Sequence, residues 1–511
     1  MTSTTSETPR TYGNWIAKQS PGLGRLGLIG TILLFVSVII LVIVKQALGL
    51  LPGLITAALF VPVLAPLLYH DRVGHNGWQI IIRRVAWRLG IARGQDIYVS
   101  SLTDAWLNGI QKLPGLLAPS NLHEFNTVAG KTVAMIEHPA VHQYAVIIRV
   151  QPDGSSLVDP DTIDAWVSQW GWFLGDLGSE PGLVGASATV QTSPDPGNRL
   201  SLEVDRLLVP TAPALARDTL IEAARTYPLG SASVDAWVTL IFSAYRREKQ
   251  EREAFTKTAE TAPSKIRTSS EMATLIASRL PGLLAQLAVS GAGVGTPMSA
   301  QDVTDFIRVA YDPHVAEVLD AAKETGEDSA VDWDHAGPAA AREGWGSYRH
   351  DGGASIVWTM AAPPRQAVES RVLTNLLAPH PDVHCKRITI IYRPYNAGDA
   401  SAVIDSQVRT AQGKNAGRAT QTVQSERAAQ SAQEEANGAG LARFSMIVTS
   451  TVRDPKKLGQ AGETSMQLSR ASRITLRRAY GCQGATFAAG LGVGVLLTEL
   501  TTVPSAIRDY I

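Results

Sequence analysis

The acidic and histidine side chains that could do chemistry gather in one polar stretch of the chain. Asp332, Asp334 and His335 lie within four residues, and His350 and Asp351 follow a short interval later. A carboxylate beside an imidazole can transfer protons in a general acid–base reaction. The same residues also fit a solvated loop between two parts of a domain, which is the interpretation that we favour.

Two further motifs have the spacing of metal ligands. His138 and His142 are four residues apart, as on a zincin helix, but the glutamate of that motif is missing. His380, His384 and Cys385 offer three ligands within six residues, and no partner cluster stands elsewhere in the chain. We therefore predict no metal site and no bound cofactor.

A nucleotide motor needs a glycine-rich loop with a lysine and a serine or threonine at fixed spacing. Gly-Lys-Thr at 130–132 is the only such triplet, but Phe125 stands where the first glycine should be, and no clear strand precedes it. The glycine-rich stretches 290–297 and 490–497 contain no lysine. With no nucleophile motif either, we expect no enzymatic activity and no catalytic residues.

Composition gives no sign of a nucleic-acid partner. Lys and Arg together number 46, as do Asp and Glu, so no overall charge attracts nucleic acid, and we expect no sequence-specific binding to it. Trp166, Trp170 and Trp172 stand near helical spacing without interleaved lysines, which favours core packing over a base-stacking platform. The two cysteines, Cys385 and Cys482, fit a reducing compartment.

The strongest signal is a pair of uncharged apolar runs, 26–44 and 47–69, separated by Lys45 and Gln46. Each is long enough to cross a bilayer as a helix, so we predict a transmembrane hairpin over 26–69. The segment 1–25 precedes it. Basic residues flank both ends, and the positive-inside rule places both ends in the cytoplasm, with an external turn near Lys45. The flanking basic residues are Arg10, Lys18, Arg25, Arg72, Arg83, Arg84, Arg88 and Arg93.

The stretch 70–95 mixes apolar residues with arginines. As a helix it would lie on the headgroups of the lipid bilayer, its arginines facing anionic lipid. An ordinary linker helix explains the same pattern, and both interpretations stay open.

Beyond residue 95 the pattern predicts an α/β (α+β) fold of repeated strand–helix–strand units. Strands are expected at 142–152, 183–192, 233–245, 353–363, 385–395 and 442–454, and helices at 159–178, 269–288, 299–311, 365–378 and 456–473. The order suggests two related lobes, 96–325 and 326–511. A polar helical arm is expected at about 400–440, where apolar residues are scarce.

The stretch "YGCQGATFAAGLGVGVLLTEL", residues 480–500, admits three interpretations: a third span, a phosphate loop or a buried element. The lysine needed for a phosphate loop is missing, and five glycines make a poor membrane helix. We therefore expect a helix and turn at the edge of the second lobe.

Residues 442–494 resemble the end of the N-terminal domain of the large assembly ATPases of type IV secretion and conjugation systems. In that family a strand, a pair like Asp454-Pro455, a long helix and a short strand precede a "Gln…Ala-x-Phe…Leu-x-Gly" passage, although the proline usual in its last turn is missing here. The residues that match the passage are Gln483, Ala485, Phe487, Leu491 and Gly492.

The N-terminal part resembles a PrgI-like two-span protein, and "RTYGNW" with "SPGLGRLGLIG" is similar to actinobacterial membrane proteins of conjugative elements. The resemblance implies a domain without its motor, hence a structural component of a conjugative or type IV-like secretion apparatus. Its implied partners are a separate conjugation-type assembly ATPase, other membrane secretion subunits and a second copy of the chain. A type VII secretion component, or a membrane-anchored enzyme using Asp332, His335 and His350, are the alternatives.

Overall fold

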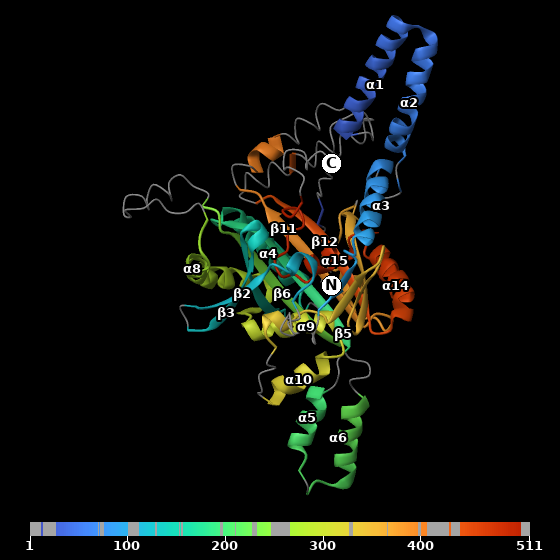
Figure 1. Ribbon diagram of the computed structural model, residues 1–511. Coiled ribbons are helices and arrows are strands. Elements are labelled where there is room, and N and C mark those ends of the chain that lie inside the picture. The colour runs from blue at the N-terminus through green and yellow to red at the C-terminus, as the bar shows by residue number, and fades with distance from the viewer. Residues whose placement is uncertain are drawn as a thin grey trace, which may run out of the picture. The chain divides into compact units, whose positions relative to one another are not determined.

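The computed structural model describes most of the chain, in two units that we treat separately (Figure 1). The smaller unit comprises Ile16–Asp96 and Thr498–Ile511, and the larger comprises Met1–Trp15 and Ile97–Leu497. The described residues are 12–13, 27–69, 71, 76–100, 112–127, 130–152, 154, 157–194, 198–209, 211–226, 232–246, 266–325, 331–364, 366–396, 400–405, 429–430 and 440–501.

The smaller unit is built from three helices, α1 (Gly27–Leu48), α2 (Leu50–Leu68) and α3 (Gly77–Ala92). The first two form a hairpin whose turn is Gly49. The predicted break at Lys45 and Gln46 is wrong, because α1 continues through both residues. Gly49 has a φ of +95°, a conformation that glycine adopts without the steric cost of a side chain, and this ends the helix.

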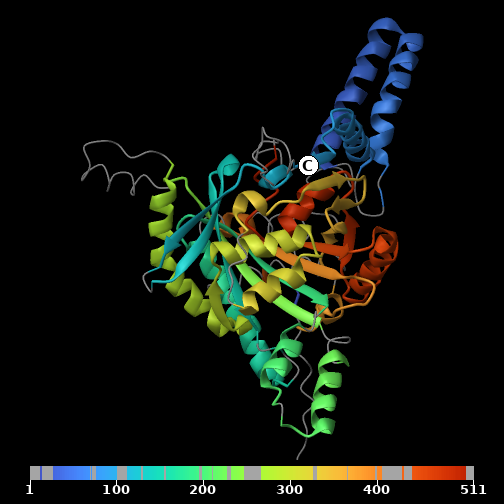
Figure 2. The ribbon, with the colours of Figure 1, turned by 60° about the horizontal axis from the view of Figure 1, so that its bottom comes forward.

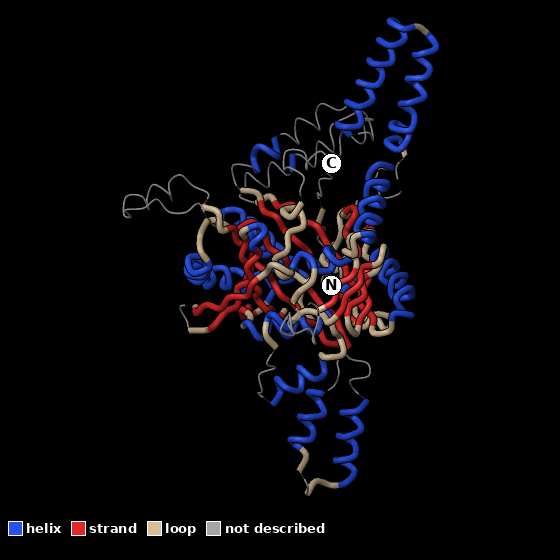
Figure 3. The backbone as a smooth tube through the Cα atoms, in the orientation of Figure 1, coloured by secondary structure: helices blue, strands red, loops and turns tan. Residues whose placement is uncertain are grey.

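The larger unit is organised by one antiparallel sheet, which has 13 strands in the described residues (Figure 3). The main order is β1-β8-β9-β10-β12-β11-β5-β6-β4-β3-β2, with β13 on β10 and β7 on β4. The prediction of a mixed helix-and-strand domain is confirmed. The strands are β1 (Ile97–Val99), β2 (Asn121–Asn126), β3 (Thr132–His138), β4 (Gln143–Gln151), β5 (Leu183–Pro194), β6 (Ala232–Ser243), β7 (Val294–Pro297), β8 (Ala340–Glu343), β9 (Tyr348–His350), β10 (Gly353–Ala362), β11 (Cys385–Pro394), β12 (Ala442–Val452) and β13 (Thr475–Arg478).

The strands follow the same pattern of order on the two sides of the central β5–β11 pair. β6, β4, β3 and β2 follow on one side, and β12, β10, β9 and β8 on the other. β1 departs from the predicted lobe boundaries, since it falls in the range 96–325 but pairs with β8 in the range 326–511. The division into two lobes stays a prediction.

One face of the sheet carries the main apolar cores. Helices α4 (Pro160–Ser179) and α8 (Ser269–Leu287) pack on β4 and β6 on this face. Helices α11 (Thr374–Leu377) and α14 (Leu458–Ala471) cover β10 and β12 in the same way. Consecutive residues of β4 and β6 are buried, and such near-continuous apolar runs explain why these strands were predictable from the sequence.

The opposite face is covered by α9 (Ala300–Tyr311), by α15 (Gln483–Gly490) and by the residues after α15. This face is polar at its centre, where the Thr189 hydroxyl donates to Thr389 Oγ1 at 3.1 Å. The Thr389 hydroxyl donates to Gly490 O at 2.7 Å, and the Thr239 hydroxyl to Gly492 O at 2.5 Å. The stretch 483–495 is thus buried in the domain, which agrees with the third interpretation of the sequence 480–500.

Some elements lie outside the predicted pattern. α5 (Asn198–Leu207) and α6 (Ala214–Thr226) form a helical hairpin between β5 and β6 that stands away from the sheet in both views (Figures 1 and 2). α10 (Ala316–Thr325) follows α9. The short helical turns are η1 (Gly115–Leu117), η2 (Pro139–Val141), η4 (Ala288–Ala292), η5 (Trp333–His335) and η6 (Pro455–Lys457).

The helices predicted at 365–378 and at about 400–440 have different outcomes. The helix expected at 365–378 is reduced to α11, because Val368 instead pairs with Tyr12 through two backbone hydrogen bonds of 2.7 Å each. The polar arm predicted at about 400–440 lies mostly outside the described residues. Within that range the structure describes 400–405, 429–430 and 440.

Candidate functional site

The α1–α2 hairpin carries the clearest functional surface. By length and composition, two helices in the described residues could cross a membrane, Gly30–Leu48 and Ser269–Ala292, and a shorter apolar helix runs over Leu50–Pro62. These helices differ in what covers them. In α8 the apolar side chains Met272, Ile276 and Leu280 are buried against the sheet, so this helix belongs to the core.

The apolar side chains of α1 and α2, by contrast, are exposed. Ile39 is 55 % exposed, Ile43 59 % and Leu59 70 %, and almost no residue of the apolar window in α1 is buried. Water disfavours such a surface by roughly 25 cal/mol per Å² of apolar area. A continuous exposed apolar surface of this kind therefore marks a membrane or protein interaction site.

Helix length and backbone chemistry fit a bilayer. α1 has 22 residues and α2 has 19, which correspond to about 33 Å and about 29 Å of rise, close to a hydrocarbon core of about 30 Å. The hydroxyls of Ser37 and Thr56 donate to the carbonyls of Leu33 and Pro52 at 2.7 and 2.8 Å. These polar side chains thus need no partner outside their own helix, as a lipid environment requires.

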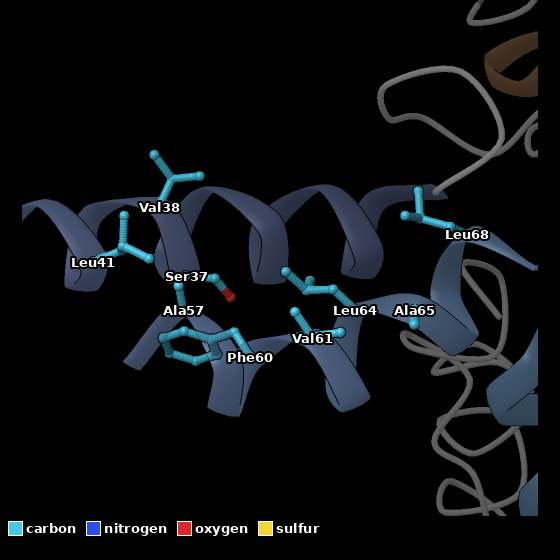
Figure 4. Close-up of a pocket in the computed structure, with 9 residues that line it drawn as sticks. All are labelled: Ser37, Val38, Leu41, Ala57, Phe60, Val61, Leu64, Ala65 and Leu68. Atoms are coloured by element: carbon cyan, nitrogen blue, oxygen red, sulfur yellow. The ribbon is translucent and has the colours of Figure 1, made fainter. Parts of the chain in front are cut away.

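A groove of about 250 Å³ runs between the two helices (Figure 4). Ser37 is its one polar lining residue, and its hydroxyl is already bonded to a carbonyl. The groove can therefore accept apolar atoms, but it offers no group for catalysis or for binding a charged ligand. The lining residues are Ser37, Val38, Leu41, Ala57, Phe60, Val61, Leu64, Ala65 and Leu68.

Helix α3 is packed against the end of α2. A capping box starts it: the Gln79 amide donates to Asn76 Oδ1 at 3.1 Å, and the Asn76 amide donates to Gln79 Oε1 at 3.3 Å. A Cβ at Gly77 would come within 2.6 Å of the Pro66 carbonyl oxygen, so the close approach requires glycine.

The solvent face of α3 combines apolar and basic residues. Ile82, Val85 and Leu89 are about half exposed or more and lie on one side of the helix. Arg84 and Arg88 are exposed beside them, and the helix contains no acidic residue. This arrangement is typical of a helix that lies in the headgroup region of an anionic bilayer.

The acidic and histidine residues singled out in the polar stretch do not form one site. Asp351 accepts hydrogen bonds from Arg308 and from the amides of Ala339 and Ala340, all at 3.0 Å, so it fixes the start of β8. Asp332, Asp334 and His335 belong to the short turn η5 or its cap. His350 lies apart from them, buried beneath α9.

His350 is part of a buried polar chain. Its Nδ1 lies 2.6 Å from Tyr311 O, its Nε2 lies 2.8 Å from Ser355 Oγ, and Ser355 Oγ lies 2.8 Å from Thr451 Oγ1. A serine bonded to an imidazole can be a nucleophile, but here both side chains are 1 % exposed or less, so no substrate reaches them. Burial lowers the pKa of His350 to about 4.

This depressed pKa predicts a stability that depends on pH. His350 takes up a proton near pH 6.5 in the unfolded chain and only near pH 4 in the folded chain. The free energy of unfolding therefore falls by about 3 kcal/mol as the pH is lowered between these values. His350→Gln keeps a donor and an acceptor but does not titrate. Urea unfolding of the full-length protein at pH 7 and pH 5 should therefore show a smaller pH effect in the variant than in the wild type. An unchanged pH effect would contradict this role.

The first metal-like motif serves a structural purpose, and the second is partly buried. Nε2 of the buried His138 lies 2.9 Å from Val493 O, while His142 has a left-handed backbone and its ring packs edge-on against Tyr245. Burial lowers the pKa of His384 to about 4 and raises that of the Cys385 thiol. In the described part of the chain no group of three potential ligands converges.

The Gly-Lys-Thr triplet follows a strand that the sequence did not reveal. β2 precedes it and β3 begins at Thr132, so the triplet belongs to a hairpin turn in which Gly130 has a φ of +76°. A P-loop lysine stands before a helix instead, where the helix N-terminus holds phosphate.

Comparison with known proteins addresses only the N-terminal region. A family model described as a domain of unknown function (DUF8461) matches residues 19–79. The matched range contains α1 and α2 and the start of α3. No curated protein matches the chain.

Proposed function

We propose that the protein is a membrane-anchored structural component of a conjugative or type IV-like secretion apparatus. In this proposal the α1–α2 hairpin spans the cytoplasmic membrane twice, and the larger unit docks a separate P-loop ATPase on the cytoplasmic side. The observation that carries the proposal is the exposed apolar surface of the hairpin, joined in one chain to a large α/β domain.

The residues behind the family resemblance have structural roles in this chain. Gln483 makes two hydrogen bonds to the backbone of β10. Its Oε1 accepts from the Val357 amide at 2.8 Å, and its Nε2 donates to Val357 O at 3.1 Å. Phe487 packs between the rings of Tyr311 and Tyr348, at centroid distances of 5.3 and 5.2 Å. Side chains with such roles hold a fold together, and a stable folded surface is what a docking role requires.

Charge supports the proposed orientation. Arg83, Arg84, Arg88 and Arg93 follow the hairpin within or just after α3, and the positive-inside rule assigns such a segment to the cytoplasm. Arginines on that side would also face the anionic leaflet.

A pull-down of the full-length protein from native membranes in mild detergent, followed by mass spectrometry, tests the docking role. We expect a P-loop ATPase of the conjugation type among the main partners. A variant lacking residues 97–501 should lose the ATPase while still reaching the membrane. An intact complex that contains no ATPase would contradict the proposal.

A further inference from the structure

The two ends of the sheet correspond in strand order and in the register of the inner strands. His138 in β3 stands opposite Gln143 in β4, and His350 in β9 stands opposite Gly353 in β10. Each imidazole contacts a carbonyl that arrives from the other half: Val493 O for His138 at 2.9 Å, and Tyr311 O for His350 at 2.6 Å.

Backbone hydrogen bonds repeat the same correspondence. The Met298 amide after β7 donates to Ile147 O in β4 at 2.9 Å, and the Ala479 amide after β13 donates to Val357 O in β10 at 3.0 Å. These matches place β2 and β8 at equivalent positions, each beyond the third strand from the centre.

The two outer strands differ in whether another strand pairs with their outer side. β1 pairs antiparallel with β8, through Ile97 with Arg342, Tyr98 with Ala341 and Val99 with Ala340. On β2, in the part of the chain that the structure describes, no strand pairs with the outer side.

The outer side of β2 presents backbone donors and acceptors. The Ala134 amide in β3 donates to Met298 O at 2.9 Å, so it points away from β2. In an antiparallel pair, two residues that stand opposite each other direct their N–H and C=O groups either both toward the partner strand or both away from it. Glu124 stands opposite Ala134, so its N–H and C=O point outward, and so do those of Leu122 and Asn126.

This edge lacks two of the features that usually prevent strand addition, a bulge and a proline. The β2–β3 register runs without a bulge from Asn121 to Asn126, and β2 contains no proline. Glu124 is exposed at its middle. A negative charge there favours a strand that brings a basic residue, and it disfavours self-pairing in the register that sets two copies of Glu124 opposite each other.

We propose that β2 is a docking edge for an extended segment of a partner protein. The segment would add antiparallel to β2, as β1 does to β8, and would place a lysine or arginine opposite Glu124. This goes beyond the proposed function, since it holds whether or not the partner belongs to a secretion apparatus.

Proline at position 124 gives a sharp test. Glu124→Pro removes the outward N–H and blocks the edge. Among the described residues no strand pairs with that side of β2, and edge strands tolerate proline at such a position. Glu124→Ala is the matched control, because it removes the charge and keeps the N–H. Both variants are made in the full-length chain with the photoreactive residue p-benzoylphenylalanine in place of Asn126, and irradiated in native membranes.

We expect an adduct whose site in the partner maps to an extended segment with a basic residue. Its yield should persist, somewhat reduced, in Glu124→Ala and fall roughly tenfold in Glu124→Pro. Equal melting temperatures of the two variants would exclude misfolding. The proposal is overturned if the two yields are equal, if the adduct joins only residues of the same chain or β2 of a second copy, or if no adduct forms.

Discussion

Replacing Ile39 and Ile43 with aspartate is expected to move most of the protein out of the membrane fraction. Both side chains are more than half exposed and lie one helical turn apart on α1. On a surface in water, such substitutions would change stability by about 0.5 kcal/mol or less. In the middle of a bilayer each aspartate costs about 3 kcal/mol, so the pair costs about 6 kcal/mol.

The measurement is the share of full-length protein that stays in the membrane pellet after alkaline extraction. Ile39→Leu with Ile43→Leu is the matched control and should stay in the pellet. If the aspartate variant also stays there, the hairpin does not cross the hydrocarbon core, and another part of the chain holds the protein at the membrane.

Gly492→Ala is expected to destabilise the larger unit by about 2–5 kcal/mol, as the sum of backbone strain and overpacking. Gly492 has a φ of +70°, and a Cβ there would lie 2.3 Å from Thr189 Oγ1 and 2.8 Å from Trp237 Nε1. Its carbonyl also accepts the Thr239 hydroxyl, so the backbone cannot retreat without losing that bond.

Gly459→Ala provides the control for this substitution. Gly459 lies in α14, where an added Cβ meets nothing within 4 Å, and alanine favours the helix by roughly 0.5–1 kcal/mol. Urea unfolding followed by tryptophan fluorescence should show a lower midpoint for Gly492→Ala and an equal or higher one for Gly459→Ala. An unchanged midpoint for Gly492→Ala would mean that residues 491–496 do not pack on the sheet.

The sequence predicted the elements that leave a recognisable trace in it, such as a long apolar run or a capping motif. The strands near 142–152 and 442–454 are rich in β-branched residues, and α8 and α9 begin at capping boxes. β2 and β9 left no such trace: "NLHEFN" is mostly polar, and "YRH" is too short for a period. We predicted the hairpin turn near Lys45 because a charge interrupts the apolar run there. The turn lies at Gly49 instead, where glycine allows the positive φ that ends the helix.

The site residues show a different limit. Nothing in the sequence near His350 indicates that Tyr311 and Ser355 will enclose it, because the crossing of α9 over the sheet creates that environment. Residue types and spacing therefore favoured a solvated loop, with proton transfer as the alternative, whereas tertiary packing buries His350 in a structural role. The apolar hairpin was predictable because a bilayer demands a long run of one residue class.

Labelling with a membrane-impermeant maleimide tests the central claim, a two-span anchor with a cytoplasmic domain. Cys482 is exposed on the larger unit and reports on its side once Cys385 is replaced by serine. Lys45→Cys, in a chain without the two native cysteines, reports on the end of α1, one helical turn before Gly49. The account predicts that intact cells label Lys45→Cys at once and Cys482 only after permeabilisation. Labelling of Cys482 in intact cells, or protection of Lys45→Cys there, would contradict it.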